Sequence, residues 1–131
     1  MTTVVPVARP GALALGRVAA VLVATSAVVH VLQADTASLA GLLMPVMAVA
    51  CLPCAWHLWR APTPAVWGMT AALDAGMILV HATLMAGGGM AMHHGAAGPG
   101  TLAWAGLVLA GAQLALAALA AVAAVPRAGT R

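Results

Sequence analysis

Residues 11–32 read GALALGRVAAVLVATSAVVHVL, a run of 22 residues in which Arg17 is the one side chain charged at neutral pH. A helix needs about 20 apolar residues to cross a hydrocarbon core of about 30 Å. Three further stretches meet this requirement, so the predicted membrane spans are residues 11–32, 39–59, 66–87 and 102–125. The sequence therefore predicts an all-α fold: an integral membrane four-helix transmembrane bundle, with residues 1–131 in a single membrane domain.

The overall composition leads to the same class. Hydrophobic residues make up 64% of the chain and charged residues 5%, and the mean hydropathy is +1.08. A soluble domain carries about 25% charged residues, so this chain cannot build a water-facing shell, and the lipid bilayer is its expected surroundings. Nucleic-acid binding is not expected, because five arginines scattered along the chain form no basic stripe.

The positions of the arginines predict the orientation. In a four-span topology all of them fall on one side of the membrane: Arg9, Arg17, Arg60, Arg127 and Arg131. The positive-inside rule makes that side cytoplasmic. Arginine without lysine, together with abundant alanine, points to a GC-rich bacterial genome. We therefore expect a multi-pass protein of the bacterial plasma membrane with its N-terminus and C-terminus in the cytoplasm.

The tryptophans predict the same boundaries, because Trp side chains concentrate at both membrane interfaces. Three of them fall at the arginine-bearing boundary and Trp104 falls at the opposite one; the three are Trp56, Trp59 and Trp67. One alternative stays open for the first span. Arg9 and Arg17 followed by residues 18–31 also have the layout of a signal peptide, and cleavage near Ala37 would leave three spans.

Soft metal ligands gather toward the outer face of this topology. By helical rise, His30 lies about 3–5 Å below the outer end of its span, Met44 about 7–8 Å and His81 about 9 Å. Imidazole and thioether groups suit copper, and thioethers select Cu(I), whereas a site for a hard ion is disfavoured by the presence of only two carboxylates. The candidate copper ligands are His30, Met44, His81, Met85, Met90, Met92, His93 and His94.

Two other interpretations of these residues remain open. Methionine is a flexible gap-filler in helical cores, so the Met and His residues could serve core packing in an accessory or structural subunit. Abundant small residues favour contact with other membrane-protein subunits or with further copies of the chain. Alternatively, His30 and His81 could be axial ligands in a haem-binding helix bundle, although no Cys-x-x-Cys-His motif is present.

Three other residues could carry chemistry within the spans. Cys51-Leu-Pro-Cys54 is interpreted as a pair of buried thiols, with a transient metal relay as the alternative. Asp74 is the one carboxylate deep inside a span, and such groups are functional candidates. Arg17 is its expected ion-pair partner, and a proton or cation relay with Gln113 is the alternative. We expect no enzymatic activity, because the chain has no Ser-His-Asp arrangement, phosphate loop or paired catalytic carboxylates.

Two segments carry a resemblance to known proteins. Leu42-Leu-Met-Pro-Val-Met-Ala-Val49 and His81-Ala-Thr-Leu-Met-Ala-Gly-Gly-Gly-Met-Ala-Met-His-His94 resemble the helices of small Met/His-rich multi-pass membrane proteins of unknown function from actinobacteria. The resemblance covers the second and third spans and implies no activity and no ligand set. The chain also resembles eukaryotic-type copper transporters, but it has Met44-x-x-Met47 in place of Met-x-x-x-Met and four spans in place of three.

Overall fold

The computed structural model describes residues 10–86 and 100–124, and α-helices are the regular elements of this part of the chain. The four helices are α1 (Pro10–Leu32), α2 (Leu39–Arg60), α3 (Pro64–Ala86) and α4 (Gly100–Ala124). All four are long and apolar enough to cross a membrane. The predicted all-α, four-helix transmembrane bundle is therefore confirmed, and every predicted span end lies within two residues of the observed one.

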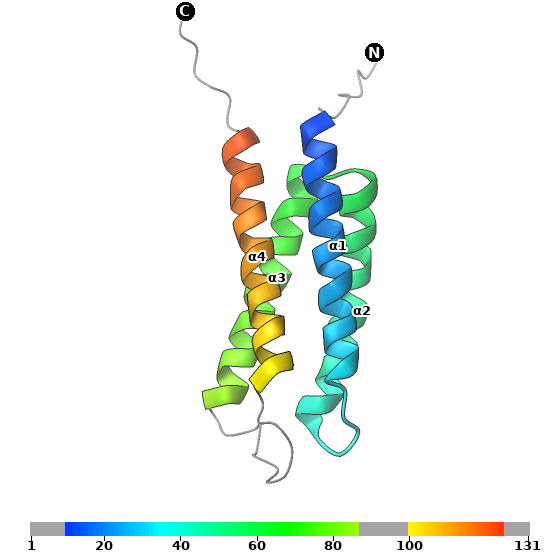
Figure 1. Cartoon of the computed structure of the whole chain (residues 1–131), viewed down its shortest axis with the longest axis vertical. Helices are drawn as coiled ribbons and strands as arrows, with labels where there is room; N and C mark the ends of the chain where they lie inside the picture. The colour runs from blue at the N-terminus through cyan, green and yellow to red at the C-terminus, as the bar shows by residue number, and fades with distance from the viewer. Residues whose placement is uncertain (1–9, 87–99, 125–131) are drawn as a thin grey trace, which may run out of the picture.

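The helices run side by side and alternate in direction (Figure 1). α1 packs against α2 and α4, and α3 packs against α4 and α2. Within the described helices, the backbones of the diagonal pairs, α1 with α3 and α2 with α4, do not come into contact. One end of the bundle, which we call the turn end, carries the α1–α2 turn of residues 33–38. The other, the junction end, carries the α2–α3 connection of residues 61–63.

Local sequence signals account for where α2 and α3 begin. The Ser38 hydroxyl accepts a hydrogen bond of 3.0 Å from the Gly41 amide, and the Thr63 hydroxyl accepts one of 3.3 Å from the Val66 amide. These contacts satisfy amide groups that lack a partner in the first turn of a helix. Pro64 occupies the first position of α3, where its fixed φ angle is favourable and its missing amide is no loss.

Pro45 and Pro53 lie inside α2, which remains helical through both. A proline within a helix leaves the carbonyl four residues earlier without its usual donor, and for Pro45 that carbonyl belongs to Gly41. The α1–α2 turn supplies the replacement, because the Asp35 amide donates to the Gly41 carbonyl at 3.4 Å. Asp35 also accepts from the Ala37 amide at 2.9 Å. The turn is therefore built around Asp35.

The interior consists of layers in which each helix contributes a residue every seven positions, as in coiled-coil-like bundles. Contacts fix the register between helices. A Cβ atom on Gly16 of α1 would lie 2.7 Å from the Leu58 carbonyl of α2. Moving 14 residues along each of these antiparallel helices pairs His30 with Met44. On the other side, a Cβ atom on Gly106 of α4 would lie 3.8 Å from His81 Nε2 of α3.

Three layers follow from this register, each two helical turns, or about 10 Å, from the next. The layer nearest the turn end, which we call the histidine layer, contains His30, Met44, His81 and Gly106. The middle layer, which we call the aspartate layer, contains Val23, Cys51, Asp74 and Gln113. The layer nearest the junction end contains Gly16, Leu58, Trp67 and Ala120. Buried side chains separate the first two of these layers: the polar Ser26 and the apolar Ala27, Ala48, Met77 and Ala110.

Candidate functional site

Two histidines from diagonally opposite helices meet inside the bundle. His30 of α1 and His81 of α3 are almost completely buried, with 1% and 2% of their surfaces exposed. Their rings pack edge to face, with centroids 5.6 Å apart and ring planes at 80°. The predicted convergence of these two candidate ligands is therefore observed.

The backbone fixes which nitrogen of each ring carries the proton. His30 Nδ1 lies 2.7 Å from the Ser26 carbonyl, and His81 Nδ1 lies 2.9 Å from the Met77 carbonyl. A carbonyl oxygen can only accept, so each Nδ1 is the donor, and in a neutral imidazole the other nitrogen then carries a free lone pair. Both Nε2 atoms are buried and have no hydrogen-bond partner in the described structure. Each ring therefore carries a buried lone pair with no donor to meet it.

The other two helices complete the histidine layer with residues that offer no hydrogen bond. Met44 of α2 is 3% exposed, and its thioether is a soft, weakly accepting group. On α4, Gly106 brings the backbone against His81, since a Cβ atom there would lie 3.8 Å from His81 Nε2 and 3.7 Å from Gln33 Nε2. Gln33 in turn donates to the Leu102 carbonyl at 3.1 Å, which joins the turn end of α1 to α4.

The remaining predicted ligands are not part of the described site. Met85 lies one turn beyond His81 in α3, but its side chain is outside the described part of the chain. Met90, Met92, His93 and His94 lie wholly outside the described residues. Within residues 10–86 and 100–124, no three His, Cys, Asp or Glu side chains gather where they could share a metal ion. The described candidate site is thus the two imidazoles with Met44.

The aspartate layer holds a second group of buried polar side chains. Asp74 and Gln113 are each 1% exposed, and Asp74 Oδ2 and Gln113 Oε1 have no hydrogen-bond partner in the described structure. The Gln113 amide nitrogen donates to the Leu109 carbonyl at 3.2 Å. The predicted ion pair between Asp74 and Arg17 is wrong. Arg17 is exposed and its guanidinium lies over the Trp59 ring, 5.6 Å from the centroid, because that position keeps the charge at the bundle surface.

Cys51 and Cys54 are free thiols, both buried. They lie on the interior side of α2, Cys51 at the height of Asp74 and Cys54 one turn further toward the junction end. This agrees with the interpretation of the pair as buried, unpaired thiols.

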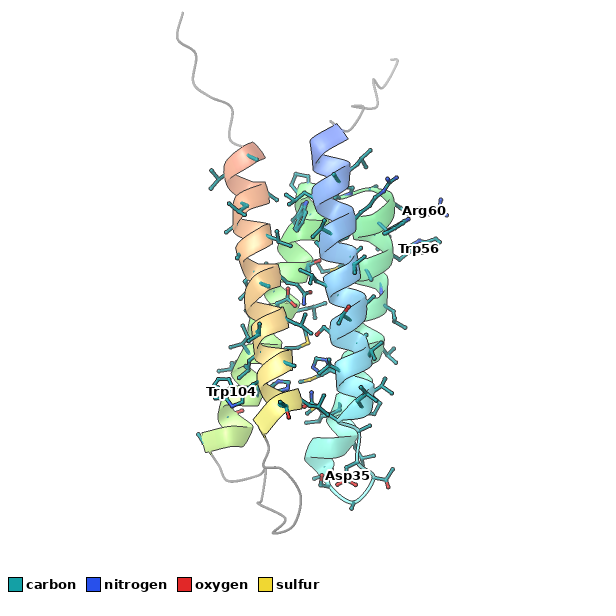
Figure 2. All side chains as sticks on the ribbon, viewed as in Figure 1. Asp35, Trp56, Arg60 and Trp104 are labelled. Carbon is teal, nitrogen blue, oxygen red and sulfur yellow. The ribbon has the colours of Figure 1, made fainter. Side chains whose placement is uncertain are left out.

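Tryptophan and arginine mark the two ends of the bundle. Trp56 and Arg60 lie near the junction end and Trp104 near the turn end (Figure 2), and the Arg60 guanidinium lies 4.5 Å from the centroid of the Trp56 ring. Trp67 departs from the prediction that it belongs to an interfacial belt. It is 9% exposed, because it fills the layer of Gly16 and Leu58 inside the bundle.

Sequence reasoning missed Ser26 and Gly106. Ser26 is fully buried, its carbonyl accepts from His30, and its hydroxyl has no partner in the described structure. The signal for Ser26 was its place four residues before His30. Gly106 could be found only by extending the seven-residue repeat to α4, where alanine and glycine dominate and no side chain marks the inward face.

An apolar groove of about 720 Å³ lies at the junction end of the bundle, remote from the histidine layer. Trp67 is its one aromatic residue, and the lining contains no histidine and no charged residue. A porphyrin in this groove would find no axial ligand in the lining. The groove is lined from α1, α3, α4 and the junction by Gly11, Ala12, Leu15, Pro62, Pro64, Trp67, Gly68, Ala71, Leu114, Ala117, Ala118, Ala120, Ala121 and Ala123.

Comparison of the chain with models of protein families, with curated proteins and with solved structures finds no match in any of the three.

Proposed function

We propose that this multi-pass membrane protein is a non-enzymatic copper-binding protein that holds Cu(I) between His30 and His81. One observation carries the proposal: two buried imidazoles face each other with both Nδ1 atoms engaged by backbone carbonyls and both Nε2 lone pairs unpartnered. Buried polar atoms in proteins are nearly always hydrogen-bonded. Two neutral histidines with rings in contact and both Nε2 atoms unpartnered are what a pair of metal ligands requires.

The ligand chemistry favours copper in its reduced state. Neutral imidazole suits copper, and a thioether favours Cu(I) over harder ions. With metal–imidazole bonds of about 2.0 Å, two rings bound on opposite sides of one ion have centroids roughly 6 Å apart, and bending brings them closer. The observed 5.6 Å fits a bent pair that leaves room for Met44 as a third ligand.

The arginine distribution supports placing this site toward the outside of a bacterial plasma membrane. Arg60 lies at the junction end, which the positive-inside rule makes cytoplasmic. The histidine layer then lies below the outer surface, on the side where α3 ends and the chain continues into Met90, Met92, His93 and His94. We propose that these loop residues deliver copper to the buried pair.

Copper titration of the purified protein tests the proposal. The wild-type chain in detergent is titrated with Cu(I) against a chromogenic Cu(I) chelator, beside His81→Leu and His30→Leu. His57→Leu is the matched control, because His57 is exposed on α2, near the junction end. We expect one tightly bound copper per wild-type chain, at least a tenfold loss of affinity in either site variant, and no change in the control. A wild-type chain that stays metal-free under these conditions would sink the proposal.

The same protein preparation distinguishes a haem site from a copper site. Haem would need a porphyrin-sized slot between the imidazoles, whereas α4 already lies against His81 at Gly106. We expect no Soret absorption after incubation with haemin. A Soret band that appears in wild type and is lost in His81→Leu would show that the ligand is haem and not copper.

The apolar groove favours a second candidate, an accessory subunit that packs against a membrane protein. Its lining of alanine and glycine resembles the small-residue surfaces at which transmembrane helices approach closely. Native electrophoresis after gentle solubilisation tests this candidate. A stable larger assembly that dissociates in Ala118→Leu would support it, and migration as an isolated monomer would argue against it.

A further inference from the structure

The aspartate layer contains two buried acceptor oxygens that have no hydrogen-bond partner in the described structure. Asp74 and Gln113 lie at the same height on neighbouring helices, and the Gln113 amide nitrogen is already engaged by the Leu109 carbonyl. That leaves Gln113 Oε1 and Asp74 Oδ2 buried and unpartnered in the described structure. Two buried acceptors are destabilising unless a proton or a cation lies between them. A proton on Asp74 turns its carboxyl group into the missing donor.

Few other charges act on Asp74 from the helices packed around it. α2 presents the thiols of Cys51 and Cys54, and both lie within electrostatic range of the carboxyl group. α4 presents Gln113, which does not titrate. α1 presents Val23 at this height and, one turn toward the turn end, the buried hydroxyl of Ser26, which does not titrate; Arg17 stacks on Trp59 at the surface. Within the described residues, therefore, no fixed positive charge compensates an ionised Asp74.

A positive charge would arise in the histidine layer if the proposed copper ion binds there. Its two imidazoles and Met44 are neutral ligands, so a bound Cu(I) ion would bring a net charge of +1 into a low-dielectric interior. The aspartate layer lies two turns away, about 10 Å along the helix axis. At that distance and with little screening, a carboxylate strengthens the binding of a monovalent cation on the order of tenfold.

We infer that Asp74 is a proton-exchange site coupled to the histidine layer: a metal-free layer favours the protonated carboxyl group, and Cu(I) in the layer favours the carboxylate. The inference rests on the proposed function. Because the coupling is about tenfold, each Cu(I) ion that binds displaces at most about half a proton from Asp74 Oδ2 to the solvent, which partly offsets the charge of the ion. Gln113 Oε1 accepts from the protonated carboxyl, and the coupling to the metal acts through space.

Two measurements test the exchange, and Asp35 provides the matched control. Asp35 is the only other acidic residue of the chain and is exposed in the α1–α2 turn. The first measurement is an infrared difference spectrum between metal-free and Cu(I)-loaded protein. We expect the carbonyl stretch of a protonated carboxyl to weaken on loading, in wild type and in Asp35→Asn, and to be absent in Asp74→Asn. In Gln113→Leu that stretch should shift, because the acceptor is gone.

The second measurement is the pH dependence of Cu(I) affinity. Because binding releases a proton, affinity should rise with pH in wild type and in Asp35→Asn. Asp74→Asn should bind Cu(I) about tenfold more weakly at high pH. The part of the pH dependence that comes from Asp74 should be absent in this variant. Copper binding with an unchanged carboxyl band and an unchanged pH slope in Asp74→Asn would overturn the exchange and leave the copper site standing. A wild-type chain that binds no copper would overturn both.

Discussion

At the scale of single residues, the backbone partner of a histidine decides what its ring is free to do. His30 and His81 both hydrogen-bond through Nδ1 to the carbonyl four residues earlier, a bond that a helix offers at every position. The ring is held in one orientation by its own helix, and Nε2 is left free to bind a ligand. This local geometry makes the pair a ligand candidate, whereas a core histidine would have both nitrogens satisfied.

Gly106 provides a test at this scale that leaves the ligands themselves in place. A Cβ atom there would lie 3.8 Å from His81 Nε2, an ordinary van der Waals contact. Gly106→Ala should therefore fold normally, while Gly106→Val should obstruct the lone pair. We expect Cu(I) affinity to fall at least tenfold in Gly106→Val, with helix content by circular dichroism unchanged.

The control for this experiment is Gly111→Ala on the same helix, where a Cβ atom would meet nothing within 4 Å. It should bind copper as wild type does. Equal affinities in wild type and Gly106→Val would show that the ion does not approach His81 Nε2 from the α4 side.

At the scale of the elements, α1 and α2 form the tightest pair through a glycine. A Cβ atom on Gly16 would lie 2.7 Å from both the Leu58 carbonyl and the Pro62 Cβ atom, so Gly16→Ala forces the two helices apart. Overpacking of this kind costs about 1–3 kcal/mol. We expect a lower melting temperature in detergent for Gly16→Ala, measured by circular dichroism.

Gly76→Ala is the comparison for that variant, because a Cβ atom at Gly76 meets nothing within 4 Å. Alanine is a better helix former than glycine by about 1 kcal/mol, so Gly76→Ala should melt at the same temperature as wild type or higher. An unaltered melting temperature in Gly16→Ala would mean that α1 and α2 can separate slightly without loss of packing.

The helices themselves were predictable from the sequence, because a membrane span needs length and apolarity and little else. The stripe of Asp74, Met77 and His81 along α3 was also predictable from helical spacing. The pairing of Asp74 was not. Arg17 follows Gly16 in the layer nearest the junction end, about 9 Å along the axis from the height of Asp74, and it stacks on Trp59 at the surface. Distance along one helix follows from sequence, whereas the register between helices and the direction of a side chain require the neighbouring helices.

At the scale of the whole molecule, orientation in the membrane is the property most open to test. Arg60, Arg127 and Arg131 are expected to resist transfer across the bilayer, and residues 88–100 contain no arginine and no acid. A reporter fused after Arg131, or inserted between Trp59 and Pro64, should read as cytoplasmic, and one inserted near Gly95 as external. An external C-terminus would invert the topology and place the histidine layer on the cytoplasmic side.

The architecture also decided what could be predicted of the site. His30 and His81 were foreseen at similar depths, and the bundle brings them together across its diagonal. The side chain of Met85 and the four loop residues lie outside the described part, so their role stays a prediction. Gly106 and Ser26 could not be foreseen, because their contributions depend on the absence of a side chain and on a backbone carbonyl.

The residues between the histidine and aspartate layers have a consequence for the depth that a soft metal ion could reach in this bundle. Ala27, Ala48 and Ala110 offer no ligand, but the buried thioether of Met77 lies between the two layers, as does the fully buried Ser26. A thioether suits Cu(I). The interior below the histidine layer is therefore not closed to such an ion by a lack of ligands.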